Sequence, residues 1–248
     1  MKREFIYRAE VGSTNSEIKA MARASAAPVT AVLRAGAQSG GRGRQNKAFY
    51  SPAGGVYFSA AFPLSGDETH ISFLTLLSGL AVCRALESMC PAPYRIKWPN
   101  DIYLNGKKIC GILTELVSVG PRLTAVVGIG VNTKLAPGDI PPALSSVMTS
   151  LQAEGLRAPD PDALVKTAVS LLDHYVYDLR ALSADTTAFT KEINARAYLT
   201  GRTVAVDTGS ETVSGTVTGI SPAGLLQLDT PQGEKEILSG TVTEIHTR

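Results

Sequence analysis

The 248-residue chain has little cysteine, almost no excess of charge and no long apolar run. Its net charge is only +2, whereas a dedicated nucleic-acid-binding protein is usually far more basic. The three cysteines, Cys83, Cys90 and Cys110, form an odd and sparse set that does not fit a disulfide framework. No two of them have zinc-site spacing, and the three histidines are far apart. We therefore expect the cysteines to be buried, reduced and apolar in role.

Neither a signal peptide nor a membrane span is expected. The first residues, MKREFIYRAEVG, lack the continuous apolar stretch of a secretory signal. The longest apolar-rich segment, 71–83, is interrupted by polar residues and is too short to cross a bilayer. The sequence therefore predicts a cytoplasmic protein that does not associate with membranes.

Apolar spacing and turn signals predict an α+β fold for most of the chain. The run T-N-S-E at 14–17 indicates a capping box, so a helix is expected to begin there. Helical spacing predicts further helices over 70–90 and 162–182. Strands are expected at 30–35, 56–62, 94–98, 102–104, 109–117 and 123–131. Asn105-Gly106 is a strong hairpin signal between two of these strands, and 135–161 is expected to be loop.

The residue pattern of the sequence changes after Leu199. Five short runs of alternating character, divided by turn signals, fill the last 50 or so residues. This pattern predicts a small closed β-barrel. We therefore place a boundary near Tyr198, with one domain over 1–198 and a second over 199–248.

The loop G-G-R-G-R at 40–44 is the first motif that suggests chemistry. Adjacent glycines let backbone N–H groups turn toward an anion, and Arg42, Arg44 and Lys47 add positive charge. The loop is not a Walker A motif, since GxxxxGK[ST] is absent. Taken alone it fits a solvated surface loop, a phosphate site and an RNA contact equally well.

The segments K-W-P-N-D at 97–101 and K-K-I-C-G at 107–111 form the second motif. Lys107 lies beside the hairpin turn and is expected to be a surface residue. Alternation along a strand would place Lys108 on the same face as Cys110, so Lys108 is expected to point inward. Gly111, inside a strand, indicates that a ligand or another part of the backbone approaches closely.

Two shorter motifs leave alternatives open. Thr14, in S-T-N at 13–15, is best interpreted as a helix cap. Asn132, at the end of G-I-G-V-N, fits a turn residue and a polar contact equally well. No Ser/His/Asp or Cys/His arrangement with a known local signature is present. The cationic motifs therefore favour phosphoryl or nucleotidyl transfer, in which positive groups offset charge on phosphate oxygens.

Taken in order, these motifs resemble those of the biotin–protein ligases. The matching runs are S-T-N at 13–15, Q-S-G-G-R-G-R at 38–44, S-P-A-G-G-V-Y-F-S at 51–59, K-W-P-N-D-I at 97–102, G-K-K-I-C-G-I-L-T-E at 106–115 and G-I-G-V-N at 128–132. The resemblance implies a mixed β-sheet catalytic domain flanked by helices, of the class II synthetase-like biotin/lipoate ligase fold, followed by an SH3-like barrel.

The resemblance also implies the reaction. Biotin and ATP would form biotinyl-5′-AMP with the help of Mg²⁺, and a lysine of a biotin carboxyl carrier domain would then take the biotin. Lys108 and Arg44 correspond to the catalytic cations. Biotin contacts would come from Ser13, Thr14, Asn15, Gln38, Gly41, Arg42 and Gly111. Nucleotide or adenylate contacts would come from Arg42, Arg44, Phe49, Lys97, Asn100, Asp101, Lys108 and Asn132; the metal ligands are left unassigned.

The loop departs from the family pattern G-R-G-R-x-G-R-x-W. Asn46, Lys47 and Phe49 stand at its last three defined positions. Asn tolerates positive φ, Lys keeps the charge but loses the fork of arginine, and Phe keeps an aromatic face but loses the indole N–H. These changes raise the question of how tightly the adenylate is retained.

Several further expectations follow from the resemblance. S-T-N begins at residue 13, which leaves no room for the winged helix of family members that act as repressors, so no DNA binding is expected. Related enzymes can pair through sheet edges, which allows a homodimer. The rival interpretations are a lipoate–protein ligase, which shares the catalytic architecture, and an RNA-binding module that uses the glycine–arginine loop.

Overall fold

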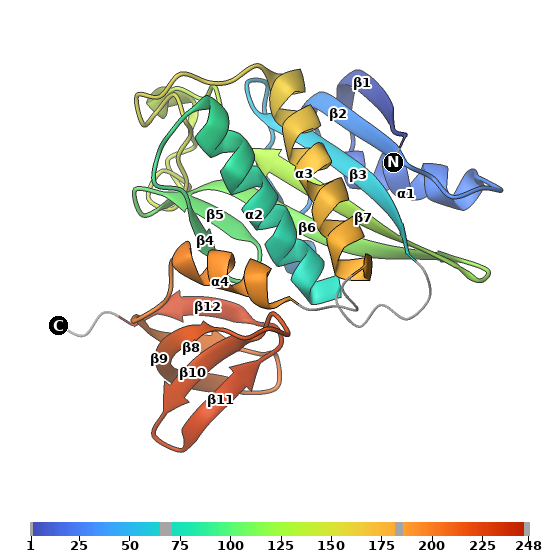
Figure 1. The fold of residues 1–248 in the computed structure, drawn as a ribbon. Helices are drawn as coiled ribbons and strands as arrows, with labels where there is room; N and C mark the ends of the chain where they lie inside the picture. The colour runs from blue at the N-terminus through green and yellow to red at the C-terminus, as the bar shows by residue number, and fades with distance from the viewer. Residues whose placement is uncertain (1, 65–70, 182–185, 246–248) are drawn as a thin grey trace.

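The computed structural model describes residues 2–64, 71–181 and 186–245, which form two sheets and the helices around them (Figure 1). The larger sheet has seven strands in the order β1-β2-β3-β7-β6-β5-β4. Its strands are β1 (Glu4–Val11), β2 (Ala31–Gln38), β3 (Val56–Leu64), β4 (Arg95–Lys97), β5 (Asp101–Leu104), β6 (Lys107–Val119) and β7 (Arg122–Val131). β1 runs parallel to β2 and the remaining neighbours are antiparallel, so the sheet is mixed.

Helices cover both faces of this sheet. On one face α1 (Thr14–Ala24) packs through Ile18 and Ala22 against Leu33 and Val126. On the other face α2 (Ile71–Met89) and α3 (Pro161–Ala181) lie side by side (Figure 1). Successive residues of β2 and β7 enter the two cores in turn, as a two-sided sheet requires. Two 3-10 turns, η1 (Arg44–Asn46) and η2 (Pro137–Asp139), lie in loops.

The structure confirms most of the elements expected for residues 14–182. The hairpin forms as predicted, with positive φ at both Asn105 and Gly106. The helix expected from 70 begins at Ile71 within the described residues, and the expected end at 182 lies outside them. β1 and α4 (Thr187–Ala195) were not predicted.

The C-terminal residues form a five-stranded antiparallel sheet, ordered β11-β10-β9-β8-β12. Its strands are β8 (Thr203–Asp207), β9 (Thr212–Ile220), β10 (Leu226–Thr230), β11 (Gly233–Ile237) and β12 (Thr241–Glu244). The five strands were predicted correctly, but the closed barrel was wrong: β11 and β12 do not pair within residues 203–244. Its apolar side chains belong to the same core as those of the seven-stranded sheet, so the smaller sheet does not need to close on itself to bury them.

Several contacts join the C-terminal sheet to the rest of the molecule. Trp98 donates its indole N–H to the carbonyl of Gly224 at 3.0 Å. The ammonium of Lys97 lies 3.2 Å from a carboxylate oxygen of Glu244. In Figure 1, α4 lies between the C-terminal sheet and α2. None of the helices in the described parts of the chain is long and apolar enough to cross a membrane.

Candidate active site

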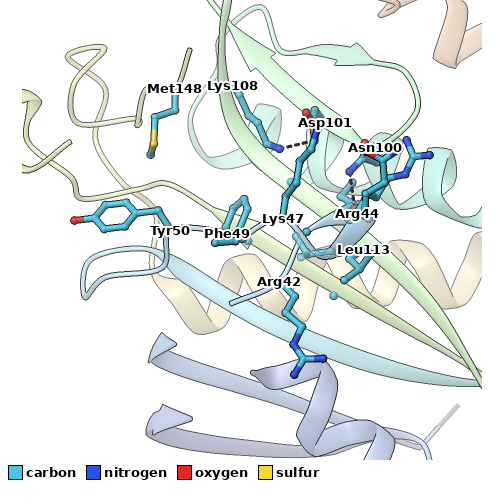
Figure 2. Close-up of a pocket in the computed structure, with 18 of the residues that line it drawn as sticks. Arg42, Arg44, Lys47, Phe49, Tyr50, Asn100, Asp101, Lys108, Leu113 and Met148 are labelled. Carbon is cyan, nitrogen blue, oxygen red and sulfur yellow. Dashed lines mark hydrogen bonds and ion pairs between the residues drawn. The ribbon is translucent and has the colours of Figure 1, made fainter. Parts of the chain in front are cut away.

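A cavity of about 440 Å³ lies on the α1 face of the large sheet (Figure 2). Strands β6 and β7 provide its floor, and the start of α1 lines one end. The loop that contains Arg42–Tyr50 and the turn at Gly240–Val242 also line it, so segments next to both sheets contribute to the cavity.

Three glycines, which have no side chains, leave space above the floor of the cavity. Gly111 and Gly130 pair across β6 and β7. Gly128 lies two residues before Gly130 on β7. A Cβ atom at Gly111 would lie 2.7 Å from the Phe49 ring, and one at Gly130 would also meet that ring. A Cβ at Gly128 would meet the side chain of Asn15. Side chains at these positions would fill the space that a ligand needs.

A buried polar cluster closes one end of the cavity. Thr14 donates its backbone N–H (2.9 Å) and its hydroxyl (3.1 Å) to Oε1 of Gln38. Ser59 Oγ lies 2.7 Å from Thr14 Oγ1 and 2.6 Å from Asn15 Oδ1. Nε2 of Gln38 donates to the hydroxyl of Ser51 at 2.9 Å. These links fix the orientation of five polar side chains around one end of the cavity.

The expectation that Thr14 caps α1 was wrong. Ser13 is the N-cap residue and Thr14 is the first helical residue, and no side-chain capping bond forms. The hydroxyl of Thr14 instead bonds across to β2 and β3. The Ser/Thr–x–x–Glu pattern therefore predicted the N-cap one residue too late in the chain. The hydroxyl of Thr14 bonds to other strands and not to the helix backbone.

Glu115 supports the same cluster from β6. Its carboxylate accepts from Nδ2 of Asn15 at 2.8 Å and from Nζ of Lys19 at 2.5 Å. Burial alone would raise the pKa of Glu115, but these two hydrogen bonds and the charges of Lys19 and Arg42 outweigh it, so the pKa is lowered from its ordinary value. Glu115 therefore remains ionised and holds Asn15 in place.

Lys108 lies over the floor, with its ammonium 2.7 Å from Oδ1 of Asp101 (Figure 2). The expectation that Lys108 shares a face with Cys110 was wrong. The register of β5 and β6 shifts between Ile102 and Tyr103, so that Ile102 pairs with Cys110 and Tyr103 with Lys108. This bulge reverses the alternation. Cys110 faces the core under α2, and Lys108 faces the cavity.

A neighbouring segment holds the bulged part of β6. The backbone N–H of Lys108 donates to the carbonyl of Val147, and its carbonyl accepts from Thr149. The ammonium of Lys107 instead donates to the carbonyl of Ser145 at 2.7 Å, on the surface of the molecule. Adjacent lysines thus have different surroundings, with one at the cavity and one in solvent.

The glycine–arginine loop crosses one side of the cavity. Nη1 of Arg44 lies 3.3 Å from the carbonyl of Gly240, and Thr241 donates to Oε1 of Gln45 at 3.2 Å. Burial lowers the pKa of Arg44 from its ordinary value, while the charge of Asp101 partly opposes the shift. Arg42 also lines the cavity, but its guanidinium is turned away from Lys108 and Asp101 (Figure 2).

Two further amides line the cavity, and Asn132 lies just past the end of β7, away from Asn15. Asn132 is buried, and its Nδ2 donates to the carbonyl of Thr149 at 3.0 Å. Its Oδ1 has no hydrogen-bond partner among the residues that the structure describes, which marks it as an acceptor available to a ligand. Nδ2 of Asn100 donates to the carbonyl of Ile112 and so holds the turn before β5.

The structure brings nearly all of the expected site residues around one cavity. Its lining includes Ser13, Thr14, Asn15, Gln38, Arg42, Arg44, Phe49, Lys97, Asn100, Asp101, Lys108, Gly111 and Asn132. Gly41 is not among the lining residues and packs behind them, where a Cβ would lie 2.5 Å from Ser51 Oγ. Sequence analysis missed Ser59, Met148 and Thr241. The signal for Ser59 was a lone polar residue inside an apolar strand, whereas Met148 and Thr241 carried none.

The cavity has one acidic group, Asp101, among its described lining residues. No cluster of three or more His, Cys, Asp or Glu side chains that could hold a metal ion occurs in residues 2–64, 71–181 and 186–245. The site therefore combines cations, amides and hydroxyl groups, and suits an anionic ligand.

Comparison with known proteins gives consistent matches over both parts of the chain. Residues 10–132 match the model of the biotin/lipoate A/B protein ligase family, and residues 199–243 match that of the biotin protein ligase C terminal domain. The biotin–[acetyl-CoA-carboxylase] ligase of Paracoccus denitrificans is 33% identical, over 94% of this chain and 98% of that protein. The bifunctional ligase/repressor BirA of Bacillus subtilis is 31% identical, over 98% of this chain and 74% of that protein.

The fold is also similar to that of solved structures. The biotin protein ligase from Aquifex aeolicus, determined in complex with biotin and ATP, aligns with a TM-score of 0.83 and 28% identity. The alignment covers 98% of this chain and 99% of that one.

Proposed function

Because this chain belongs to the biotin–protein ligases of the biotin/lipoate A/B protein ligase family, we propose that its cavity activates biotin with ATP and passes it to a carrier lysine. In the first step a carboxylate oxygen of biotin attacks the α-phosphorus of ATP. The bond to the β-phosphate breaks, and pyrophosphate leaves biotinyl-5′-AMP behind. In the second step the lysine amine of a carrier domain attacks the acyl carbon, loses a proton and expels AMP.

The position of Lys108 is the observation that supports this chemistry most strongly. Its ammonium lies above a glycine floor, between the polar Thr14–Asn15 end and the Asn132 end of the cavity. Adenylation brings a carboxylate against a polyphosphate, and a fixed cation between the two reduces their repulsion. We propose that Lys108 meets the biotin carboxylate and the α-phosphate, and that Asp101 orients its ammonium.

The two ends of the cavity suggest where the substrates bind. We propose that biotin lies at the end lined by Ser13, Thr14, Asn15, Gln38, Arg42 and Gly111, with Gly41 packed behind these residues. The nucleotide would then lie along Arg42, Arg44, Phe49, Lys97, Asn100, Asp101, Lys108 and Asn132. Free Oδ1 of Asn132 suits the exocyclic amine of an adenine.

The loop around Arg44 suits the role of a lid. Acyl-adenylates hydrolyse readily, so the intermediate must be kept from water between the two steps. We propose that Arg44 and Phe49 close over it, with the turn at Gly240–Thr241 as their support. This lid departs from the family pattern at Asn46, Lys47 and Phe49. We propose that these three residues set how tightly the adenylate is retained.

Mg²⁺ enters this proposal as part of the ATP substrate. Mg²⁺ in nucleotide sites is commonly held by substrate phosphates and one or two carboxylates. Asp101 is the carboxylate at this cavity, so it is the residue that could share the ion. When bound, Mg²⁺ would neutralise phosphate charge; the cations of the chain would position the same phosphates.

The proposal extends to partners, location and domain division. The acceptor would be the biotin carboxyl carrier domain of a biotin-dependent carboxylase, with no role in DNA binding. A cytoplasmic location fits the three free cysteines. We also propose that the chain divides into one domain over residues 1–198 and a second over 199–248, and that two copies of the chain can pair.

Exchange of labelled pyrophosphate into ATP tests the first step directly. The account predicts exchange that depends on biotin. If lipoate or octanoate supports exchange and biotin does not, the substrate is wrong and the protein is a lipoate-type ligase. Salt-sensitive RNA affinity without nucleotide chemistry would instead support an RNA-binding module.

A further inference from the structure

Three lysines line the cavity, and they differ in what holds their amines: Lys47, Lys97 and Lys108. The ammonium of Lys108 lies 2.7 Å from Oδ1 of Asp101, and that of Lys97 lies 3.2 Å from a carboxylate oxygen of Glu244. The ammonium of Lys47 makes no hydrogen bond or ion pair with any residue that the structure describes. Of the three amines, that of Lys47 is therefore the one not tied to a carboxylate.

The backbone of Lys47 is held in a tight turn of the glycine–arginine loop. Its N–H donates to the carbonyl of Arg44 at 3.1 Å, and its carbonyl accepts from the N–H of Gly43 at 2.7 Å. The residue is exposed, yet it also lines the cavity. Figure 2 shows Lys47 surrounded by the other labelled cations of the site. An ordered backbone thus carries an unpaired amine that both the cavity and solvent can reach.

The chemical type of residue 47 matters as much as its position. The family pattern G-R-G-R-x-G-R-x-W has arginine where this chain has Lys47. A guanidinium stays protonated in proteins, so an arginine cannot attack a carbonyl carbon. A lysine amine can lose its proton and act as a nucleophile. The change from arginine to lysine therefore puts a potential nucleophile on the loop that is proposed to close over an acyl-adenylate.

We propose that Lys47 is a self-modification site, which takes biotin from the biotinyl-5′-AMP that forms in the cavity of its own chain. The inference rests on the proposed function, because that function supplies the intermediate. The neutral amine of Lys47 attacks the acyl carbon, and an amide C–N bond forms. The bond from the acyl carbon to the phosphate oxygen breaks, and AMP leaves with its electron pair. The proton of the amine passes to solvent.

Attachment to the same chain favours this attack over attack by other surface lysines. A nucleophile beside the intermediate reacts at an effective concentration far above that of an amine free in solution. The carrier lysine and Lys47 consume the same intermediate, so they compete for it. Modification of Lys47 should therefore proceed when the carrier is scarce and should fall when the carrier is in excess.

Mass spectrometry of the full chain after incubation with biotin, ATP and Mg²⁺ tests the inference. Peptide mapping should find biotin on Lys47 at an occupancy about tenfold or more above that of Lys166, an exposed lysine of α3 outside the cavity lining. An excess of unmodified carrier domain should lower the occupancy of Lys47. Lys47→Arg, which restores the family's arginine, should remove this label, and the matched control Lys166→Arg should keep it.

A mixing experiment separates reaction within one chain from labelling by released adenylate. A heavy-isotope copy of Lys108→Ala, which should form little adenylate of its own, is incubated with an equal amount of unlabelled wild-type protein. Reaction within one chain should give Lys47 of the wild type about tenfold or more biotin than Lys47 of the heavy copy. The fraction of wild-type chains modified per unit time should not change when the mixture is diluted.

Three results would overturn the inference. One is a wild-type protein without biotin on Lys47. Another is equal occupancy of Lys47 and Lys166, and the third is equal labelling of the two copies in the mixture. Biotin-dependent exchange of pyrophosphate into ATP is measured on the same wild-type sample. Exchange without label on Lys47 would count against self-modification alone, whereas loss of exchange would count against the proposed function and remove the intermediate that self-modification needs.

Discussion

The ammonium of Lys108 lies 2.7 Å from Oδ1 of Asp101, over a floor made of Gly111 and Gly130. The contact exists because the β5–β6 bulge turns Lys108 to the cavity face of the sheet. Asp101 holds the cation in place without blocking the cavity, so Lys108 can still approach an anionic ligand. The proposed adenylation depends on this arrangement.

Lys108→Ala should reduce biotinyl-AMP formation by about 100-fold or more, because it removes a positioned cation from the reacting phosphate. Single-turnover adenylation measures the effect. Lys107→Ala is a matched control, since Lys107 is the preceding residue and faces solvent. A normal adenylation rate in Lys108→Ala would remove this residue from the mechanism.

Arg44→Ala should speed the release of free biotinyl-AMP by about tenfold or more, because a charge-assisted hydrogen bond is worth about 1.5–3 kcal/mol. Release can be followed by trapping the labelled adenylate after preformation on the enzyme. Arg42→Ala should have a smaller effect, because its guanidinium is turned away from Lys108. Unchanged retention in Arg44→Ala would contradict a lid role for this loop.

Asn46→Gly, which restores the family's usual residue, tests the altered loop. Asn46 has φ of 57°, a conformation that glycine adopts more readily. If the sequence change loosens the lid, the variant should retain the adenylate several-fold longer in the same trapping assay. Equal retention times would show that this departure from the pattern has no effect on closure.

Gly111→Ala should raise the KM for biotin or ATP by about tenfold or more, since the added Cβ lies 2.7 Å from the Phe49 ring and 3.1 Å from Nζ of Lys108. Phe49 can swing away, but a ligand on the floor cannot. Gly138→Ala is the control, because nothing lies within 4 Å of the added Cβ. Wild-type KM values in Gly111→Ala would show that the ligand does not lie on this floor.

The stability contributed by Glu115 should depend on pH. Its pKa is lowered in the folded protein, so the contribution is present above the ordinary value of 4.5 and is lost as the pH falls through the folded pKa. Urea unfolding should show wild type more stable than Glu115→Gln by about 1 kcal/mol at neutral pH, with the difference shrinking as the pH falls below the ordinary pKa of 4.5. Glu234→Gln, an exposed control, should show no such change. A difference independent of pH would contradict the role of the ionised carboxylate.

Local signals predicted much of the fold because they act over a few residues. Asn105-Gly106 marked its hairpin, and α3 showed a clear apolar face. β1 was missed because EFIYRAEV lies at a sheet edge and is exposed except at Ile6 and Val11, so apolar and polar residues do not alternate. Closure of the C-terminal sheet was wrongly expected, because strand patterns do not show which surface will cover the apolar face.

The site was predicted as a set of residues but not as a geometry. Gly111 was expected to allow the close approach of a ligand or of backbone, and the atoms nearest to its Cβ position belong to the side chains of Phe49 and Lys108. The prediction of which sheet face Lys108 occupies was wrong, because a bulge cannot be recognised from alternation alone. The role of Thr14 was wrong because its partners, Gln38 and Ser59, come from distant strands. Long-range register determines such details.

Transfer of label to a carrier is the most direct test of the whole account. The purified protein would be incubated with ATP, Mg²⁺, labelled biotin and an unmodified biotin carboxyl carrier domain. The account predicts covalent labelling that requires ATP and disappears when the acceptor lysine of the carrier is changed to arginine. Labelling with octanoate or lipoate in place of biotin, or no ATP-dependent labelling at all, would contradict it.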